Sequence, residues 1–113
     1  MTAAGGIPNI TVQEAAALAS STDEQAAVIV DVREADELAN VRLDNAIHVP
    51  MSGFAEGAAE LPRDRPLLIL CATGVRSAAA TGYLLRSGWT DVTNVDGGIT
   101  AWERAGLPVR RGA

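Results

Sequence analysis

Short apolar runs alternate along the chain with segments that have helical periodicity. The runs at 27–30, 47–49, 67–70 and 91–95 have the length and aliphatic content of buried strands. Helical patterns fall between and around them, at 12–19, 34–40, 52–60, 76–87 and 99–105. Strands that are separated by helices favour a parallel sheet with helices on both faces. The pattern therefore predicts an α/β fold, in which ligands bind at the carboxyl ends of the strands.

Residues at the ends of these elements agree with the periodicity. Thr11 is followed three residues later by Glu14, which is the signature of a capping box, so the first helix is expected to begin near Val12. Gly88 follows the long helical segment and Gly106 the last one, and glycine readily takes the left-handed conformation that ends a helix. These local signals set element boundaries without any knowledge of the tertiary fold.

Length and hydropathy restrict the class of protein. A chain of 113 residues forms a single domain, and we expect 1–6 and 110–113 to be flexible tails. No apolar run approaches the ~20 residues that cross a bilayer. The first residues lack the basic flank and apolar stretch of a signal peptide, so we expect a cytoplasmic protein.

The charge of the chain excludes several partners. The formal net charge is −5 and the pI is about 4.7, which argues against binding to nucleic acid or to anionic membranes. All 9 basic side chains are arginines, so Schiff-base chemistry through lysine is excluded. Arginine is the better planar binder of oxyanions, which gives weight to an arginine near a reactive group.

Cys71 is the candidate for that reactive group. It ends the apolar run 67–70 and precedes a loop of small residues and a helical segment, so the backbone N–H groups of the loop should point toward its sulfur. At a helix N-terminus the pKa of a thiol falls from ~8.5 to roughly 3.5–7.5. The alternative is a buried cysteine that acts only as a small apolar side chain. As the chain has 1 cysteine, any oxidised state must be resolved by another molecule.

Several motifs together give the chain a family resemblance. They are Asp-Val-Arg-Glu at 31–34, Ala-Ile-His-Val-Pro at 46–50, Cys-Ala-Thr-Gly-Val-Arg-Ser at 71–77 and Asn-Val-Asp-Gly-Gly-Ile-Thr-Ala-Trp at 94–102, with Gly-Leu-Pro-Val at 106–109. In this order and spacing the chain resembles a single-domain rhodanese, a sulfurtransferase. The resemblance implies a three-layer fold with a central parallel five-stranded sheet. The family's usual glycine before the Ala-Ile segment is replaced by Asn45, which tolerates a left-handed turn.

The resemblance also implies a chemistry. The Cys71 thiolate would attack the outer sulfur of a donor such as thiosulfate or mercaptopyruvate and form a persulfide. A thiophilic acceptor, namely cyanide, a thiol or an acceptor protein, would then take the sulfur, without a cofactor. Arg76 would bind the donor's oxyanion or balance the thiolate, while Thr73 and Ser77 would donate hydrogen bonds or only cap the helix. The predicted active loop consists of Cys71, Ala72, Thr73, Gly74, Val75, Arg76 and Ser77.

Two other functions remain open at this point. Cysteine-based phosphatases and arsenate reductases place an arginine six positions after the cysteine, whereas Arg76 is the fifth residue after Cys71, which makes the loop too small for a phosphoryl group. The second alternative is a rhodanese-fold binding or regulatory module that makes little use of Cys71. Donor, acceptor and oligomeric state cannot be read from the residues.

The remaining candidate residues favour structural roles. His48 could act as a base for Cys71, but a structural role is favoured. Asp31 and Arg33 are expected to support the end of the sheet through ion pairing. The acidic residues Glu34, Asp36 and Glu37 lack a histidine or cysteine at ligand spacing, so no metal site is expected. Trp89 and Trp102 are expected in the core, and Gly97 and Gly98 either let the backbone approach the active loop or form only a turn. We expect a domain this small to leave Cys71 open to solvent.

Overall fold

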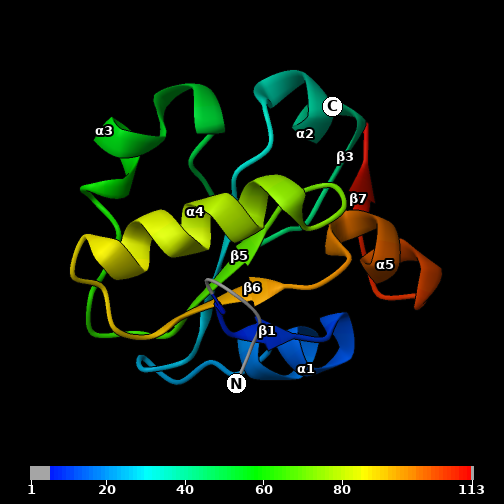
Figure 1. The fold of residues 1–113 in the computed structure, drawn as a ribbon. Coiled ribbons are helices and arrows are strands. Elements are labelled where there is room, and N and C mark those ends of the chain that lie inside the picture. Colours follow the sequence, from blue (N-terminus) through cyan, green and yellow to red (C-terminus); the bar gives the residue numbers. More distant parts are fainter. Residues whose placement is uncertain (1–5, 113) are drawn as a thin grey trace.

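The computed structural model describes residues 6–112, and in this range five strands form a parallel sheet in the order β1-β6-β5-β2-β4 (Figure 1). The strands are β1 (Asn9–Ile10), β2 (Val28–Asp31), β4 (Ile47–His48), β5 (Leu67–Leu70) and β6 (Val92–Val95). Every residue of β2 and β5 is buried, as expected for central strands that are covered on both faces. The predicted α/β architecture is confirmed.

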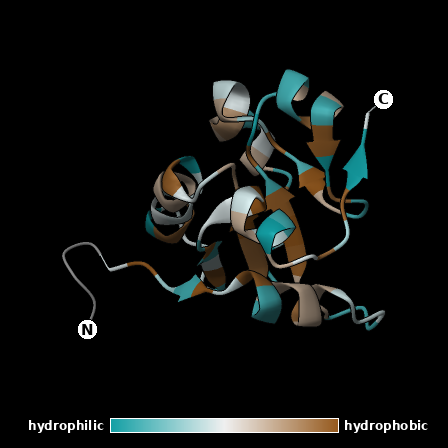
Figure 2. Ribbon diagram, turned by 90° about the vertical axis from the view of Figure 1, so that its right-hand side faces the viewer, coloured by the Kyte–Doolittle hydropathy of each residue, from teal (hydrophilic) through white to brown (hydrophobic). Residues whose placement is uncertain are grey.

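Two helical layers cover the sheet. α1 (Val12–Ala19) and α5 (Gly98–Arg104) lie on one face, while α3 (Phe54–Ala58) and α4 (Val75–Arg86) lie on the other (Figure 1). Each face has its own core, built mainly from aliphatic residues and anchored by one tryptophan, Trp89 or Trp102. In Figure 2 the central strands are mainly apolar, whereas the helices around them mix polar and apolar residues. The expectation that both tryptophans are core residues is confirmed.

Most element boundaries lie within a residue or two of their predicted positions. The Thr11 hydroxyl accepts a hydrogen bond from the Glu14 backbone N–H at 3.1 Å, and the Glu14 carboxylate accepts one from the Thr11 N–H at 3.2 Å, which confirms the capping box. Gly88 and Gly106 have φ values of 107° and 76°, as expected of glycines that end helices. The predicted helix 52–60 is divided into a 3-10 turn (Met51–Gly53) and the short α3.

The expected C-terminal tail was wrong in part. β7 (Arg110–Arg111) pairs in an antiparallel manner with β3 (Val41–Arg42), and Arg110 and Arg111 form ion pairs with Asp44 and Glu103. The sequence predicts flexibility here because it shows no partner for these two residues, whereas the backbone pairing with β3 orders them. Of the other tail residues, Gly6 is exposed and in no element, whereas 1–5 and 113 lie outside the described residues.

A membrane-spanning role finds no support in the helices. Over residues 6–112, no helix combines the length and the apolar character needed to cross a bilayer.

Candidate active site

Cys71 lies directly after β5, where the chain turns into α4. The turn depends on Gly74, whose φ of 104° is in the left-handed region that favours glycine. A Cβ atom at this position would lie 3.2 Å from the backbone nitrogen of Gly97, so the turn is also packed closely against the β6–α5 connection. Gly74 thus permits the tight curvature that the sequence predicts for the active loop.

Hydrogen-bond donors surround the sulfur of Cys71. The backbone N–H of Gly74 donates to Sγ at 3.1 Å, and the hydroxyl of Ser77 donates to it at 3.2 Å. Ser77 is fully buried, and its own carbonyl accepts a hydrogen bond from the Thr81 hydroxyl at 2.8 Å. Ser77 therefore does more than begin a helix, because its hydroxyl contacts the candidate nucleophile.

These donors change the acidity of the thiol. Burial by itself raises the pKa of Cys71, but hydrogen bonds from the Ser77 hydroxyl and from the backbone N–H groups of Ser77, Gly74 and Thr73 outweigh it. The net result is a pKa of Cys71 below the ordinary value of a thiol. The site thus favours the reactive thiolate at a lower pH than an unperturbed cysteine would.

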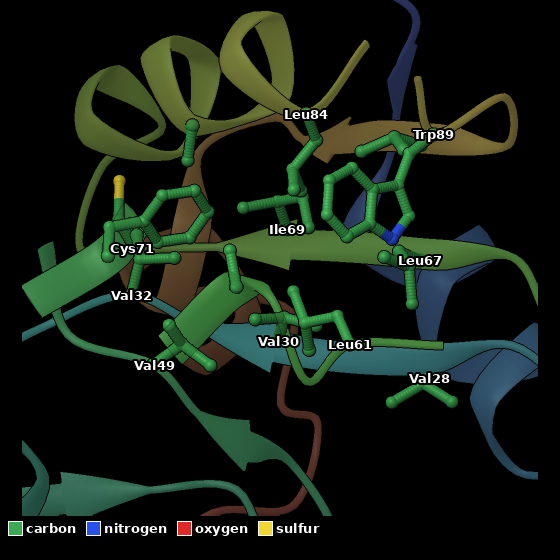
Figure 3. Close-up of a cluster of buried hydrophobic side chains, with 14 residues drawn as sticks. Val28, Val30, Val32, Val49, Leu61, Leu67, Ile69, Cys71, Leu84 and Trp89 are labelled. Atoms are coloured by element: carbon green, nitrogen blue, oxygen red, sulfur yellow. The ribbon is translucent and has the colours of Figure 1, made fainter. Parts of the chain in front are cut away.

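Cys71 is less accessible than the sequence suggested. Only 1% of the residue is exposed, and it packs in the core cluster that contains Val32 and Val49. Figure 3 shows Cys71 at one end of this cluster, with its sulfur directed toward α4. The expectation of an open mouth was wrong, since the loop folds over the sulfur. Thr73 and Val75, which is 74% exposed, form the solvent-exposed rim of the loop.

The N-terminal end of α5 is hydrogen-bonded to the backbone of the active loop. The backbone N–H of Ile99 donates to the Cys71 carbonyl at 2.9 Å, and that of Thr100 donates to the Ala72 carbonyl at 3.1 Å. Gly98 allows this approach, because a Cβ there would lie 2.4 Å from the Cys71 carbonyl oxygen. Of the two roles considered for the glycine pair, close approach to the active loop therefore applies to Gly98.

Arg76 has a partner that the sequence did not reveal. Its Nη1 and Nη2 donate to the two carboxylate oxygens of Glu37 at 2.7 and 2.8 Å, which joins α4 to α2 (Ala35–Asn40). The hydrogen bond from Arg76 lowers the pKa of Glu37 to about 2, and the same contact raises the pKa of Arg76. The residues are 39 positions apart, and no local pattern connects them.

Asp31 and Arg33 form a buried pair at the carboxyl end of β2. Arg33 Nη2 lies 2.8 Å from Asp31 Oδ2 and also donates to the Val41 carbonyl at 2.8 Å. The backbone N–H of Arg33 donates to Asp31 Oδ1 at 3.0 Å, and His48 Nε2 lies 2.7 Å from the Arg33 carbonyl oxygen. The side chains of Asp31, Arg33 and His48 are thus all used in contacts with neighbouring segments of the chain, which fits a supporting role.

Other features of the described chain offer no competing reaction centre. Between residues 6 and 112 there is no cluster of three or more histidine, cysteine, aspartate or glutamate side chains placed to bind a metal ion. A cavity of about 550 Å³ lies on the sheet face that α1 covers, lined in part by Ala16, Leu43 and Trp102, and so on the face opposite the core that holds Cys71. The candidate site at Cys71 therefore lies apart from this cavity.

Comparisons with known proteins agree with this geometry. A sulfurtransferase of Allochromatium vinosum is 38% identical over 87 residues, which cover 77% of this chain and 81% of that protein. The thiosulfate sulfurtransferase GlpE of Pseudomonas savastanoi pv. phaseolicola is 37% identical over 90 residues, or 80% and 84% of the two chains. The crystal structure of a rhodanese-related protein from Thermoplasma volcanium matches with a TM-score of 0.80 and 33% identity, covering 91% of this chain and 97% of that one.

The family assignment rests on most of the chain. The sequence profile of the rhodanese-like domain matches residues 11–105, which include four of the five strands of the parallel sheet, the loop that follows Cys71 and the turn that supports it. The family resemblance of the motifs is thus confirmed, and this chain belongs to the rhodanese-like domain family.

Proposed function

We propose that this rhodanese-type sulfurtransferase carries sulfur as a persulfide on Cys71, from a donor such as thiosulfate to a thiophilic acceptor. The observation that carries the proposal is the environment of the sulfur. Donors from Gly74 and Ser77 lie 3.1 and 3.2 Å from Sγ, and the pKa of the thiol is lowered. Such preorganised donors stabilise negative charge on the attacking sulfur and on the persulfide that follows.

The transfer divides into two displacements. In the first, the Cys71 thiolate attacks the outer sulfur of thiosulfate; an Sγ–S bond forms, the donor's S–S bond breaks, and its electron pair leaves with sulfite. In the second, cyanide, a thiol or a protein thiol attacks the outer sulfur of the persulfide, and the Cys71 thiolate is the leaving group. A lowered thiol pKa assists both steps, since the thiolate is the nucleophile of the first and the leaving group of the second.

We assign Arg76 to the balance of charge around the thiolate. Its positive charge interacts with Cys71, and this interaction contributes to the raised pKa of Arg76. The remaining residues of the loop, Ala72, Thr73 and Val75, form its backbone and its rim. The transfer requires a reduced thiol, which suits a reducing compartment such as the cytoplasm.

The proposal is tested by the mass of the intact protein after incubation with thiosulfate. We expect a gain of one sulfur atom that disappears when cyanide is added. Cys71→Ser should abolish the gain while circular dichroism and thermal unfolding stay close to those of the wild type. If neither thiosulfate nor mercaptopyruvate loads the folded protein, the chain is better explained as a binding or regulatory module.

A further inference from the structure

The net charge beside the active loop depends on the contact between Arg76 and Glu37. Nη1 and Nη2 of Arg76 both donate to the Glu37 carboxylate, in a two-point contact at 2.7 and 2.8 Å, a geometry in which arginine binds carboxylates most strongly. The two side chains are 35% and 30% exposed, so an anion in the solvent can approach the pair. An incoming anion therefore meets a neutral pair where the sequence alone suggests a free cation.

Other charged groups near this pair add negative charge. Glu34 raises the pKa of Arg76 through its charge, and its carboxylate is held in place by the Ser52 N–H and hydroxyl at 3.1 and 2.7 Å. The positive charge of Arg33 also lowers the pKa of Glu37, but Arg33 is already paired with Asp31. The described groups of this cluster thus comprise the guanidinium groups of Arg33 and Arg76 and the carboxylates of Asp31, Glu34 and Glu37. With three carboxylates against two guanidinium groups, the cluster carries a net negative charge even before Cys71 ionises.

Building on the sulfur transfer proposed above, we infer that Glu37 determines the donor charge that the site accepts. By neutralising Arg76, it makes the site favour singly charged sulfane-sulfur donors of the class R–SO₂–S⁻ over doubly charged thiosulfate. Each additional negative charge on the donor is repelled by the thiolate and by the carboxylate of Glu34, with no free cation at Arg76 to offset the repulsion. Glu37 is a specificity-determining residue that acts through Arg76.

Methanethiosulfonate is a suitable probe, because it undergoes the same bond changes as thiosulfate with one negative charge fewer. The Cys71 thiolate attacks its terminal sulfur, the Sγ–S bond forms, the S–S bond breaks, and the electron pair leaves with methanesulfinate. The persulfide product is identical for the two donors. A difference between them in kcat/KM therefore reports the charge and shape of the donor, and a change of their ratio on substitution reports the charge of the site.

Glu37→Gln tests the inference, since glutamine keeps the shape and the oxygen that accepts from the Glu34 N–H at 2.9 Å. We expect kcat/KM for thiosulfate, relative to methanethiosulfonate, to rise about fivefold when the negative charge is removed. Added sodium chloride should raise kcat/KM for thiosulfate in the wild type by screening repulsion, and should lower it or leave it unchanged in the variant. If Glu37 had a purely structural role, Glu37→Gln would lower kcat/KM equally for both donors. The salt dependence of kcat/KM for thiosulfate would then stay as in the wild type.

Asp36→Asn is the matched control, because it removes an acidic group from the same first turn of α2 at an exposed position. It should leave the donor ratio near that of the wild type, and an effect equal to that of Glu37→Gln would overturn the assignment. Should Glu37→Gln fail to fold, Arg76→Gln provides the reciprocal test and should lower the thiosulfate ratio. If the wild type loads from neither donor, the proposed function fails; if it loads but the ratio is unchanged in Glu37→Gln, only this inference fails.

Discussion

At the scale of single residues, the chemistry depends on the few groups that surround the Cys71 sulfur. A cysteine packed among valines would ordinarily be harder to ionise, because burial disfavours the charged form. Here the buried hydroxyl of Ser77 and the N–H of Gly74 are directed at Sγ, and the pKa of Cys71 is lowered despite its burial. The same enclosure that removes water from the sulfur thus supplies the donors that replace it.

Removal of the Ser77 hydroxyl should raise the pKa of Cys71. In Ser77→Ala the thiolate loses one of its stabilising hydrogen bonds, so the midpoint of its ionisation should move to higher pH and alkylation at neutral pH should slow. The pH dependence of the rate of iodoacetamide alkylation measures this midpoint. Ser87→Ala, at the exposed end of α4, is the control and should leave the midpoint unchanged. An unchanged midpoint in Ser77→Ala would contradict the role given to the hydroxyl.

At the scale of elements, two helices shape the active loop: α4, which begins within it, and α5, which is hydrogen-bonded to its first two residues. α4 begins immediately after Gly74, and the first turn of α5 donates its backbone N–H groups to the Cys71 and Ala72 carbonyls at 2.9 and 3.1 Å. These N–H groups have no partner within their own helix, because the first turn of a helix leaves its donors free. The loop is consequently held from both sides by the backbone rather than by long side chains.

Gly98→Ala tests the importance of this contact. The new Cβ would lie 2.4 Å from the Cys71 carbonyl oxygen and 2.6 Å from the Ala72 carbonyl, so the loop or α5 must shift. We expect a loss of stability of about 2 kcal/mol or more and slower sulfur loading. Urea unfolding and the rate of mass gain with thiosulfate provide the two measurements. Gly53→Ala is the control, since a Cβ there meets nothing within 4 Å, and equal effects of the two substitutions would refute the close-approach argument.

At the scale of the whole molecule, the carboxyl end of the sheet is tied to the chain's last strand. The buried Asp31–Arg33 pair joins the end of β2 to the Val41 carbonyl, and Val41 pairs with Arg111 in the small β3–β7 sheet. The pair thereby connects the central strand next to the active loop with residues far along the chain. A buried ion pair matters most when one partner is removed, because the other charge is left without compensation.

Asp31→Asn should therefore destabilise the fold strongly. The neutral amide leaves the Arg33 guanidinium buried and without its counter-charge, which we expect to cost about 3 kcal/mol of unfolding free energy. Asp44→Asn is the matched control, since the Asp44–Arg110 pair is exposed and should contribute nothing measurable. Chemical denaturation of both variants gives the comparison. A loss that is no greater in Asp31→Asn than in Asp44→Asn would remove the supporting role of the buried pair.

Local signals in the sequence were sufficient for most of the secondary structure and for the turn between β5 and α4. Aliphatic runs such as 67–70 predict buried strands, and Thr11 with Glu14 marks a helix start, because these features depend on neighbours within a few residues. β1 was missed as a strand for the same reason: its two residues, Asn9 and Ile10, carry no pattern of their own and are ordered by pairing with β6.

Three properties of the molecule depend on residues that only the folded chain brings together. The pairing of Arg76 with Glu37 joins positions 39 apart, and the order of Arg110 and Arg111 requires β3 as a partner. The burial of Cys71 follows from the packing of its loop against Val32 and Val49. A residue's type and near neighbours determine which element it forms, but its charge partner and its exposure depend on the arrangement of distant segments in space.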